Sequence, residues 1–462
     1  MNIDKIFNPK SVALIGASRK PSSVGYGIAK NLIHGGAFVS HYNVPLKGRI
    51  YLVNPNAENI IGHKCYKSIL DIKSNIDLAI VAVNPKIALG VVKECIDKKV
   101  KGVIVISAGF GELGEEGKRL QDAMAFLAKN TRIPLIGPNC LGIINTSKIN
   151  ATFAPATPRK GNIGFISQSG ALADSIIDWS LTSNYGFSKI ISYGNASVLG
   201  ISDFIDYLSK DKDTKAIAIY LESVDDGRRF MESVKKCKKP VIVLKGGKTE
   251  HGSMAAGTHT GSLSSSYEIY KAAFRQSGAI TAHTVEELFE FARLLSLGIS
   301  CSENSIGIIT NGGGCGVLAT DYCIENSVNL AAIHSDTLER IEKTGKMHPA
   351  YSRSNPLDIV GDALPERYWI AINELLKQND VHGLIVIQTM QAMTQPLEDA
   401  KVIVAASKKY PLKPILAVFM GGKLTRIGKS YLEAHSIPCY DFPEDAVFAM
   451  KALIDSVAFQ KK

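Results

Sequence analysis

The residues best suited to chemistry lie in a glycine-rich segment that holds two histidines. Residues 246–266, GGKTEHGSMAAGTHTGSLSSS, connect the strand-like run VIVLK to the helix-like run YEIYKAAFRQ. Long segments without periodicity are uncommon in compact domains and are usually functional or disordered. A histidine in such a polar loop has few core partners, and a neutral imidazole, with an ordinary pKa of ~6.5, can attack a phosphoryl group. Composition alone does not choose between His251 and His259.

An attacking imidazole needs a hydrogen-bond acceptor that holds one ring nitrogen protonated while the other reacts. The apolar run IAIYLES (217–223) brings Glu222 to the end of an expected strand. Ligands of open α/β sheets collect at the carboxyl ends of the strands, so Glu222 is a candidate for this role. The alternative is an exposed carboxylate that caps the following helix.

A second anion site is expected where the run GFIS meets Gln168, Ser169 and Gly170 before a helical pattern. The first turn of a helix offers backbone N–H donors and the positive end of the helix dipole, both of which favour phosphate. A serine that only caps the helix is an equally good reading of Ser169 taken alone.

The first segment of the chain has a further phosphate-binding pattern. The run SVALI is followed by Gly16-Ala17-Ser18 and, after a gap, by Gly25 and Gly27. The spacing differs from the GxGxxG of dinucleotide enzymes, and the next strand, YLVN, ends in Asn54-Pro55 without the carboxylate that an NAD ribose would need. Arg19 and Lys20 beside the turn suit a ligand with more phosphate charge than NAD. A tight turn without a ligand is the alternative.

These candidate residues must be positioned by alternating strands and helices. Strand–glycine–helix patterns begin at Ser11, Asn162 and Ser305, and near-continuous apolar strands alternate with helices after each. This alternation predicts an α/β fold with parallel, doubly wound sheets. Residues 145–162 and 297–305 have no periodicity and are predicted to be linkers, which gives domains at 1–147, 148–298 and 299–462.

Composition narrows the class of protein. The chain has 462 residues, 45% of them apolar, and a net charge of +10 that is spread along its length. These values exclude a disordered or disulfide-dense protein and fit an anionic small-molecule substrate at least as well as nucleic acid. The sequence shows no apolar run of membrane-spanning length, and we expect no secretory leader because its first residues, MNIDKIFNPK, lack a basic segment followed by an apolar one. Its eight cysteines have no metal-ligand spacing, so we expect a cytoplasmic protein without a metal of its own. From the spread of charge and the short apolar runs, we expect neither nucleic-acid nor membrane partners.

Seven motifs together carry a resemblance to a known family: GASRKPSSVG, VNPN, VAVNP, SAGFGE, IGPNCLGI, ISQSGAL and THTGSL, in that order. They resemble the NDP-forming acyl-CoA synthetases, the superfamily of succinyl-CoA synthetase and the ADP-forming acetyl-CoA synthetases. The resemblance implies a Rossmann-like CoA-binding domain followed by two flavodoxin-like domains of the succinyl-CoA synthetase type. The implied CoA contacts are Gly16, Ala17, Ser18, Asn54, Pro55, Val83, Asn84, Pro85, Ser107, Ala108 and Gly109.

The same resemblance implies roles in the second segment. THTGS resembles the phosphohistidine loop of the family, which places the nucleophile at His259 and leaves His251 exposed or in contact with phosphate. Glu222 would hydrogen-bond the histidine, and Ser169 and Gly170 would bind phosphate. The corresponding position of the third segment, KLTRIGKSY, lacks a histidine, so we expect one phosphate-carrying histidine per chain.

The complete reaction of this family also needs an ATP-grasp nucleotide domain, for which residues 299–462 leave no room. We therefore expect a separate ATP-grasp β subunit in an α₂β₂ assembly, with Mg²⁺ and ADP or ATP on that partner. The expected function is that of the α subunit of an ADP-forming acetyl-CoA synthetase. The alternatives are a non-catalytic CoA-binding regulatory protein of the same fold, a protein acetyltransferase, for which no further domain is present, and an NAD-dependent dehydrogenase.

Overall fold

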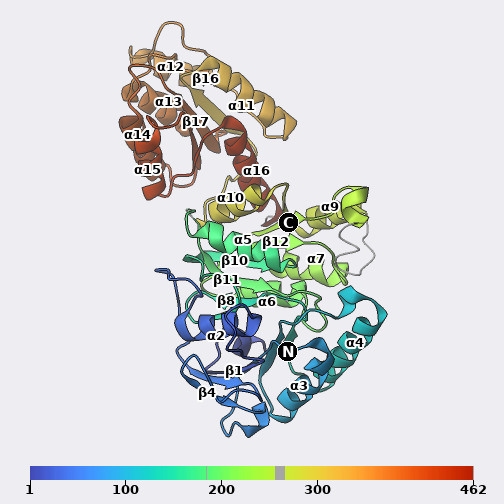
Figure 1. The fold of residues 1–462 in the computed structure, drawn as a ribbon. Helices are drawn as coiled ribbons and strands as arrows, with labels where there is room; N and C mark the ends of the chain where they lie inside the picture. The colour runs from blue at the N-terminus through green and yellow to red at the C-terminus, as the bar shows by residue number, and fades with distance from the viewer. Residues whose placement is uncertain (184, 255–265, 461–462) are drawn as a thin grey trace. The chain divides into compact units, whose positions relative to one another are not determined.

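The computed structural model describes residues 1–183, 185–254 and 266–460. The chain divides into two compact units, Met1–Arg293 and Leu294–Lys462. All three sheets are predominantly or wholly parallel and alternate with helices, which confirms the predicted α/β class (Figure 1).

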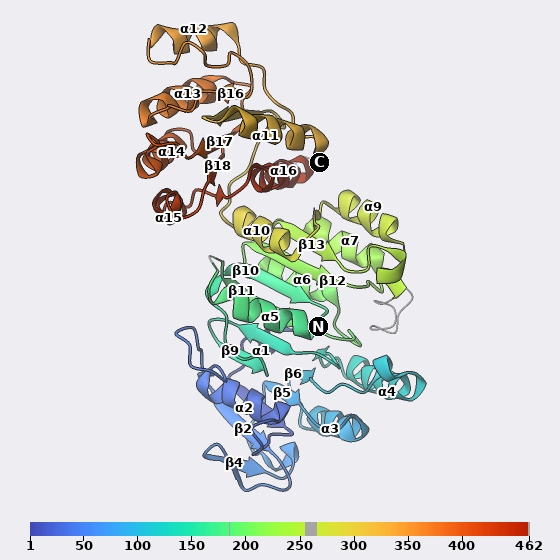
Figure 2. The same ribbon diagram turned by 45° about the horizontal axis from the view of Figure 1, so that its top comes forward.

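The first sheet of unit 1 holds seven strands in the order β3-β4-β2-β1-β5-β6-β7, all parallel except for the β3–β4 hairpin. The strands are β1 (Ser11–Ile15), β2 (Arg49–Val53), β3 (Asn59–Ile60), β4 (His63–Tyr66), β5 (Leu78–Val81), β6 (Gly102–Val105) and β7 (Leu135–Ile136). The helical segments are α1 (Asp4–Phe7), α2 (Val24–His34), α3 (Pro85–Asp97), α4 (Glu115–Asn130) and the short 3₁₀ turns Ile69–Asp71 and Gly111–Leu113. Helix α2 covers one face of the sheet and α3 and α4 the other (Figures 1 and 2).

The second sheet of unit 1 has the order β14-β13-β12-β10-β11-β8-β9. Its strands are β8 (Gly142–Asn145), β9 (Ile149–Thr152), β10 (Lys160–Ser167), β11 (Phe187–Ser192), β12 (Ala216–Leu221), β13 (Val241–Lys245) and β14 (Ile280–Ala282). Its helices are α5 (Gly170–Ser180), α6 (Ile201–Lys210), α7 (Gly227–Lys236), α9 (Tyr267–Ser277) and α10 (Val285–Ser296), the last of which crosses the boundary between the units. Strands β10 to β14 are parallel, whereas β8 and β9 form an antiparallel hairpin beside β11.

The prediction of a linker at residues 145–162 was wrong. Strand β9 and the start of β10 lie there, and every residue of β9 is buried. The polar residues that suggested a loop are bonded inside the protein. Thr152 Oγ1 donates to Asn150 Oδ1 at 2.6 Å, and Asn31 on α2 donates to the carbonyl oxygen of Thr152 at 2.8 Å. Buried polar side chains with hydrogen-bond partners are stable in a core.

One hydrophobic core connects the two sheets of unit 1. It contains Leu14 and Ile104 from the first sheet together with Ile143, Ile191 and Phe204 from the second sheet and its helices. The strands that form this core are buried on both faces, which explains their near-continuous apolar sequences. The predicted boundary between residues 147 and 148 stays a prediction.

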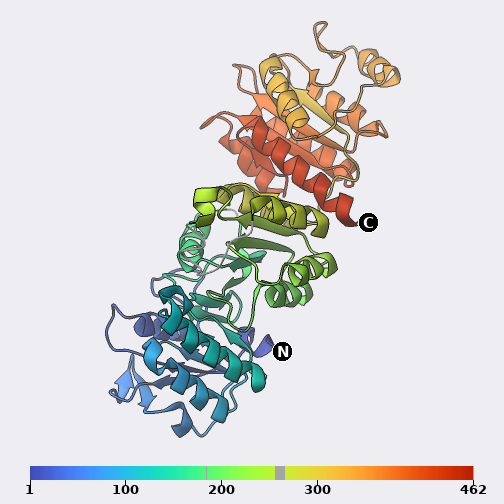
Figure 3. The ribbon, with the colours of Figure 1, turned by 90° about the vertical axis from the view of Figure 1, so that its right-hand side faces the viewer.

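Unit 2 has one parallel sheet in the order β16-β15-β17-β18-β19. Its strands are β15 (Ile306–Thr310), β16 (Leu357–Asp358), β17 (Gly383–Thr389), β18 (Ile415–Met420) and β19 (Cys439–Tyr440). Its helices are α11 (Gly313–Glu325), α12 (Ser335–Lys343), α13 (Pro365–Lys377), α14 (Pro396–Lys409), α15 (Arg426–Ala434) and α16 (Pro443–Gln460). Helices α12 to α15 follow one another on one face, and α11 packs beside the long helix α16, red in Figure 3, on the other.

A buried carboxyl in unit 2 gives a stability prediction. The side chain of Asp399 on α14 is fully buried, and its Oδ2 accepts a hydrogen bond from Gln388 at 2.5 Å. Burial raises the pKa of Asp399 to about 7. The folded protein therefore holds this proton at pH values where the unfolded chain has lost it. We expect this carboxyl to lower the free energy of unfolding by up to about 1.4 kcal/mol per pH unit as the pH rises from about 4 to 7.

The Asp399→Asn variant tests this expectation by thermal melting of the full chain at pH 5 and pH 7. Asparagine cannot ionise, so the melting temperature of the Asp399→Asn variant should fall less between these pH values than that of the unmodified chain. Glu398→Gln, at the neighbouring and more exposed carboxyl, is the matched control and should behave like the unmodified chain. Equal falls for Asp399→Asn and the unmodified chain would contradict the assignment.

Candidate active site

The first glycine turn brings the start of α2 against the end of β1. Gly16 has a φ of +91°, and a Cβ there would lie 2.1 Å from the carbonyl oxygen of Ala82. A Cβ on Gly25 would lie 2.0 Å from the carbonyl oxygen of Gly16. Each of the two positions therefore requires glycine. Without side chains there, the backbone N–H groups of the turn stay accessible to an anion at the helix N-terminus.

The Asn54-Pro55 turn fixes the neighbouring strand end to this glycine turn. The Asn54 side chain donates to the carbonyl oxygen of Ala17 at 2.7 Å and accepts a hydrogen bond from the N–H of Asn56 at 2.8 Å. Asn54 thus occupies the strand tip where a dinucleotide enzyme would carry a ribose-binding carboxylate. Its contacts hold the shape of the turn.

Two further turns of the first sheet are bonded to each other. Ser107 Oγ donates to the carbonyl oxygen of Val83 at 2.5 Å. The Asn84 side chain caps α3 by accepting a hydrogen bond from the N–H of Lys86 at 3.0 Å. The N–H of Gly109 donates to Glu112 Oε1 at 2.6 Å. The turns at the carboxyl ends of β5 and β6 are therefore held together at the rim of the first sheet.

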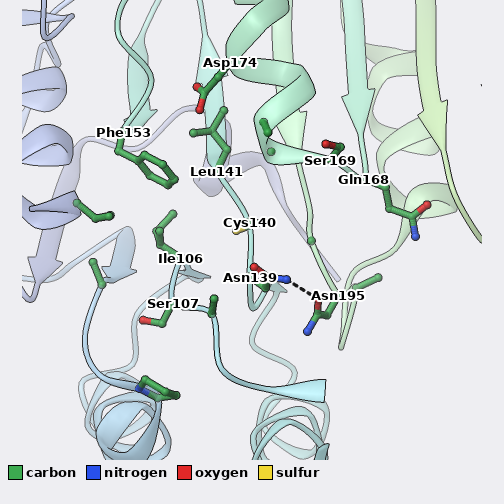
Figure 4. A pocket seen from close by; sticks show the side chains of 18 of the residues that line it. Ile106, Ser107, Asn139, Cys140, Leu141, Phe153, Gln168, Ser169, Asp174 and Asn195 are labelled. Atoms are coloured by element: carbon green, nitrogen blue, oxygen red, sulfur yellow. Dashed lines mark hydrogen bonds between the residues drawn. The ribbon is translucent and has the colours of Figure 1, made fainter. Parts of the chain in front are cut away.

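A cavity of about 620 Å³ lies within unit 1 (Figure 4). Its lining includes four of the predicted CoA contacts, Val83, Pro85, Ser107 and Ala108. The other seven predicted contacts, Gly16, Ala17, Ser18, Asn54, Pro55, Asn84 and Gly109, do not belong to this lining. Ser169, Gly170 and Glu222 from the second sheet do line the cavity. The structure thus brings together the predicted phosphate residues, the predicted orienting carboxylate and part of the predicted CoA site.

The turn predicted to bind phosphate lies at the N-terminus of α5. Ser169 caps this helix by accepting a hydrogen bond from the N–H of Leu172 at 3.2 Å. Ser167 at the end of β10 donates to the carbonyl oxygen of Ser169 at 2.7 Å and accepts from its N–H at 3.2 Å. These bonds fix the turn, and Ser169 and Gly170 both face the cavity at the positive end of the helix dipole.

Glu222 follows β12 and is held by Gln168, which the sequence analysis named only as a neighbour of Ser169, and by Tyr220, which it did not name. Its backbone N–H donates to Gln168 Oε1 at 2.6 Å, and the N–H of Ser223 donates to the same oxygen at 3.0 Å. Burial, and after it the nearby charge of Glu222, raise the pKa of Tyr220 to about 12. Tyr220 therefore keeps its proton and can donate it in the hydrogen bond that it shares with the Glu222 carboxylate.

A buried ammonium group lies near this carboxylate. Lys245 is 1% exposed and its Nζ lies 4.5 Å from the centre of the Tyr270 ring. Burial lowers the pKa of Lys245, while the charge of Glu222 acts in the opposite direction. Gly246 follows Lys245, and a Cβ at Gly246 would lie only 2.8 Å from the Tyr220 hydroxyl. The absence of a side chain at Gly246 therefore leaves room for the tyrosine beside Glu222.

Other residues of the cavity also escaped the sequence analysis. Asn139 donates to Asn195 at 3.2 Å (Figure 4), and Asn195 donates to Glu112 at 2.6 Å, which ties the second sheet to the rim of the first. Asp174 lies on α5, and Phe153 follows β9. Cys140 also lines the cavity, but burial raises the pKa of its thiol to about 12. A thiol with this pKa is not a nucleophile at neutral pH.

His259, the predicted nucleophile, lies outside the described residues, whereas His251 lies within them and is exposed. In the parts of the chain that the structure describes, no cluster of three or more His, Cys, Asp or Glu side chains could hold a metal ion. None of the described helices combines the length and the apolar character needed to cross a membrane.

Comparisons with known proteins match all three segments of the chain. Residues 10–146 match a CoA binding domain, residues 160–295 a succinyl-CoA ligase-like flavodoxin domain, and residues 306–454 a ligase-CoA domain. A structure of the dinucleotide-forming acetyl-coenzyme A synthetase 1 of Ca. Korarchaeum cryptofilum, in complex with phosphate and ADP, superposes with a TM-score of 0.89 and 35% identity. The match covers 100% of this chain and 98% of that one.

Two relatives of known activity are similar along nearly the whole chain. The α subunit of acetate–CoA ligase (ADP-forming) II from Pyrococcus furiosus is 42% identical over 98% of this chain and 97% of its own length. Acetate–CoA ligase (ADP-forming) I from Archaeoglobus fulgidus is also 42% identical over 98% of this chain, but the match spans 63% of that longer protein. With this identity along almost its entire length, the chain belongs to the ADP-forming acyl-CoA synthetase family that contains the acetate–CoA ligase α subunits.

Proposed function

We propose that the chain is the α subunit of an ADP-forming acyl-CoA synthetase that acts on acetyl-CoA. One observation carries the proposal: a single cavity is lined by Ser107 and Val83 from the CoA-binding sheet and by Ser169, Gly170 and Glu222 from the second sheet. A thioester held by the first set of residues would meet a phosphate held by the second set within this cavity.

The proposed reaction has three transfers. An oxygen of phosphate attacks the carbonyl carbon of acetyl-CoA, the C–S bond breaks, and CoA leaves with the proton as the free thiol. A ring nitrogen of His259 then attacks the phosphorus of acetyl phosphate, and the P–O bond to the acetyl group breaks to release acetate. The phosphoryl group finally passes from His259 to ADP. The free energy of the thioester is conserved because phosphate, not water, is the first nucleophile.

The residues have distinct proposed roles in these steps. Ser169 and Gly170 bind the phosphate through the first turn of α5. The Glu222 carboxylate accepts a hydrogen bond from one nitrogen of His259 and so holds the other nitrogen unprotonated for attack. We propose the CoA contacts as Gly16, Ala17, Ser18, Asn54, Pro55, Val83, Asn84, Pro85, Ser107, Ala108 and Gly109. The turns that contain them are tied to one another by the hydrogen bonds of Asn54 and Ser107.

The proposed partner is an ATP-grasp β subunit in an α₂β₂ assembly, which would bring ADP or ATP and Mg²⁺. The sheet of unit 2 keeps the strand–helix alternation of a flavodoxin-like domain from β15 to α16. This chain corresponds to 63% of the longer Archaeoglobus protein and to 97% of the Pyrococcus α subunit. The Pyrococcus protein is itself named as an α subunit, which supports a partner chain. We propose that the assembly acts in the cytoplasm and that domains 1–147, 148–298 and 299–462 are its α-subunit parts.

The function is tested by ATP synthesis from acetyl-CoA, phosphate and ADP. The purified chain alone should make no ATP beyond background, because the last acceptor binds to the partner. Co-expression of the chain with an ATP-grasp subunit should give a complex with sustained turnover. Sustained synthesis by the single chain would contradict the proposed division between subunits. A complex that binds CoA but never makes ATP would favour a regulatory CoA-binding protein.

A further inference from the structure

The charged side chains that line the cavity are all acidic. They are Asp174, Glu222 and Asp225, and no lysine or arginine belongs to the described lining. Glu222 has a role in the proposed reaction, and the helix N-terminus at Ser169 provides for the phosphate. Asp174 has no part in either task, although it lines the cavity and lies on α5, the helix proposed to bind the phosphate.

Asp174 lies one helical turn after Gly170, so both residues share the face of α5 that lines the cavity. Its side chain is half-buried, and its Oδ1 atom is buried without a hydrogen-bond partner among the described residues. Burial raises the pKa of the Asp174 carboxyl to about 6. At pH 7.5 the carboxyl is therefore mostly ionised, with no hydrogen bond to its buried oxygen.

The position of Asp174 within the cavity points to the acyl group. Figure 4 shows Asp174 with Leu141 and Phe153 at one end of the cavity and Ser107 at the other. CoA that enters along Ser107 and presents its thioester to phosphate at Ser169 would extend its acyl chain toward the far end. Leu141 and Phe153, which lie beside it there, are apolar, so Asp174 is the charged group that an acyl chain would meet at this end.

We propose that Asp174 determines which acyl groups the site accepts: its carboxylate excludes chains that end in a second carboxylate and admits short, neutral chains. This inference rests on the proposed function for the placement of CoA. Two like charges repel far more strongly in a cavity of low dielectric constant than in water. A site that discriminates by such repulsion needs no additional contact with the acyl chain that it accepts.

The test compares succinyl-CoA with butyryl-CoA, which have acyl chains of equal length with an anionic and a neutral end. Calorimetry on the full chain should give a dissociation constant at least about tenfold larger for succinyl-CoA than for butyryl-CoA at pH 7.5. The Asp174→Asn variant keeps the shape of the side chain and should remove most of this difference. Asp178→Asn, one turn further along α5 at an exposed position, is the matched control and should preserve it.

The pH dependence gives a readout that a purely structural role would not change. Below a pKa of about 6 Asp174 gains a proton, so lowering the pH from 7.5 to 5.5 should reduce the difference between the two ligands. Glu222 and Asp225 line the same cavity, and Asp178 lies on the same helix, whereas Leu141 and Phe153 are uncharged. A pH effect of equal size in Asp174→Asn would assign the discrimination to those other carboxylates and would overturn the proposal.

The proposal would also be overturned if the unmodified chain and Asp174→Asn discriminated equally between succinyl-CoA and butyryl-CoA. The same holds if Asp178→Asn lost as much of this discrimination as Asp174→Asn. Should Asp174→Asn fail to fold, Asp174→Ser provides the same removal of charge, with butyryl-CoA binding as the check on folding. Because these readouts are binding constants, they are separate from the proposed reaction. The chain could discriminate between the two ligands through Asp174 while its complex makes no ATP. That result would support the acyl-selecting role of Asp174 and contradict the proposed enzyme function.

Discussion

Replacement of His259 by alanine is expected to abolish ATP synthesis by the assembled enzyme while leaving the affinity for CoA nearly unchanged. The imidazole is the proposed carrier of the phosphoryl group, and alanine has no atom that can form the P–N bond. The proposed CoA contacts belong to the turns of the first sheet, on separate elements from residues 246–266. The two effects are measured by ATP formation in the assembled enzyme and by calorimetry with CoA.

His251→Ala is the matched control, because it removes the other imidazole of the same glycine-rich segment. His251 is exposed and has no proposed covalent role, so its replacement should lower turnover far less than that of His259. Full activity in His259→Ala, or the loss of activity in His251→Ala alone, would contradict the assignment of the nucleophile.

Replacement of Glu222 by glutamine is expected to slow turnover by roughly 10⁴-fold, the loss seen when the orienting carboxylate of a hydrolase triad becomes an amide. Glutamine preserves the shape of the side chain but removes the charge that stabilises the productive tautomer of the histidine. It also replaces the charged acceptor of the Tyr220 hydrogen bond by a neutral amide oxygen and removes the negative charge near the buried Lys245. Steady-state turnover and the pH–rate profile of the assembled enzyme measure the effect.

A carboxylate distant from the cavity serves as the control for Glu222. Glu232 on α7 is exposed and forms an ion pair with Lys236 on the same helix, so Glu232→Gln should keep nearly full turnover. The backbone bonds from Glu222 and Ser223 to Gln168 do not involve the carboxylate and should survive in Glu222→Gln. Near-normal turnover in Glu222→Gln would contradict its orienting role.

The α/β fold and the glycine turns could be predicted because each rests on a local pattern. Apolar strands followed by Gly16 or by Ser169-Gly170 predict a parallel sheet in which a helix follows each turn, and the structure has both helices. The similar runs KPVIVLKGGK (239–248) and KPILAVFMGGK (413–423) likewise each contain a strand, β13 and β18, in two different sheets. The position of Glu222 at the end of β12 follows from the same rule.

The side chains that meet from distant parts of the chain could not be predicted in this way. Phe153 lies in a segment that its polar composition marked as a linker, because the internal bonds of Asn150 and Thr152 cannot be read from the sequence. Gln168 was visible as a neighbour of Ser169, but its bonds to the backbone after β12 depend on the pairing of β10 with β12. Asp174 appears in sequence as an ordinary helix residue.

The most direct test of the account follows labelled phosphate in the assembled enzyme. The protein is incubated with acetyl-CoA and labelled inorganic phosphate in the absence of ADP, and the labelled peptide is identified under alkaline conditions that preserve phosphohistidine. The account predicts that the label depends on acetyl-CoA, lies on His259 and disappears on addition of ADP. Label on His251, or no labelled peptide in an assembly that makes ATP, would contradict it.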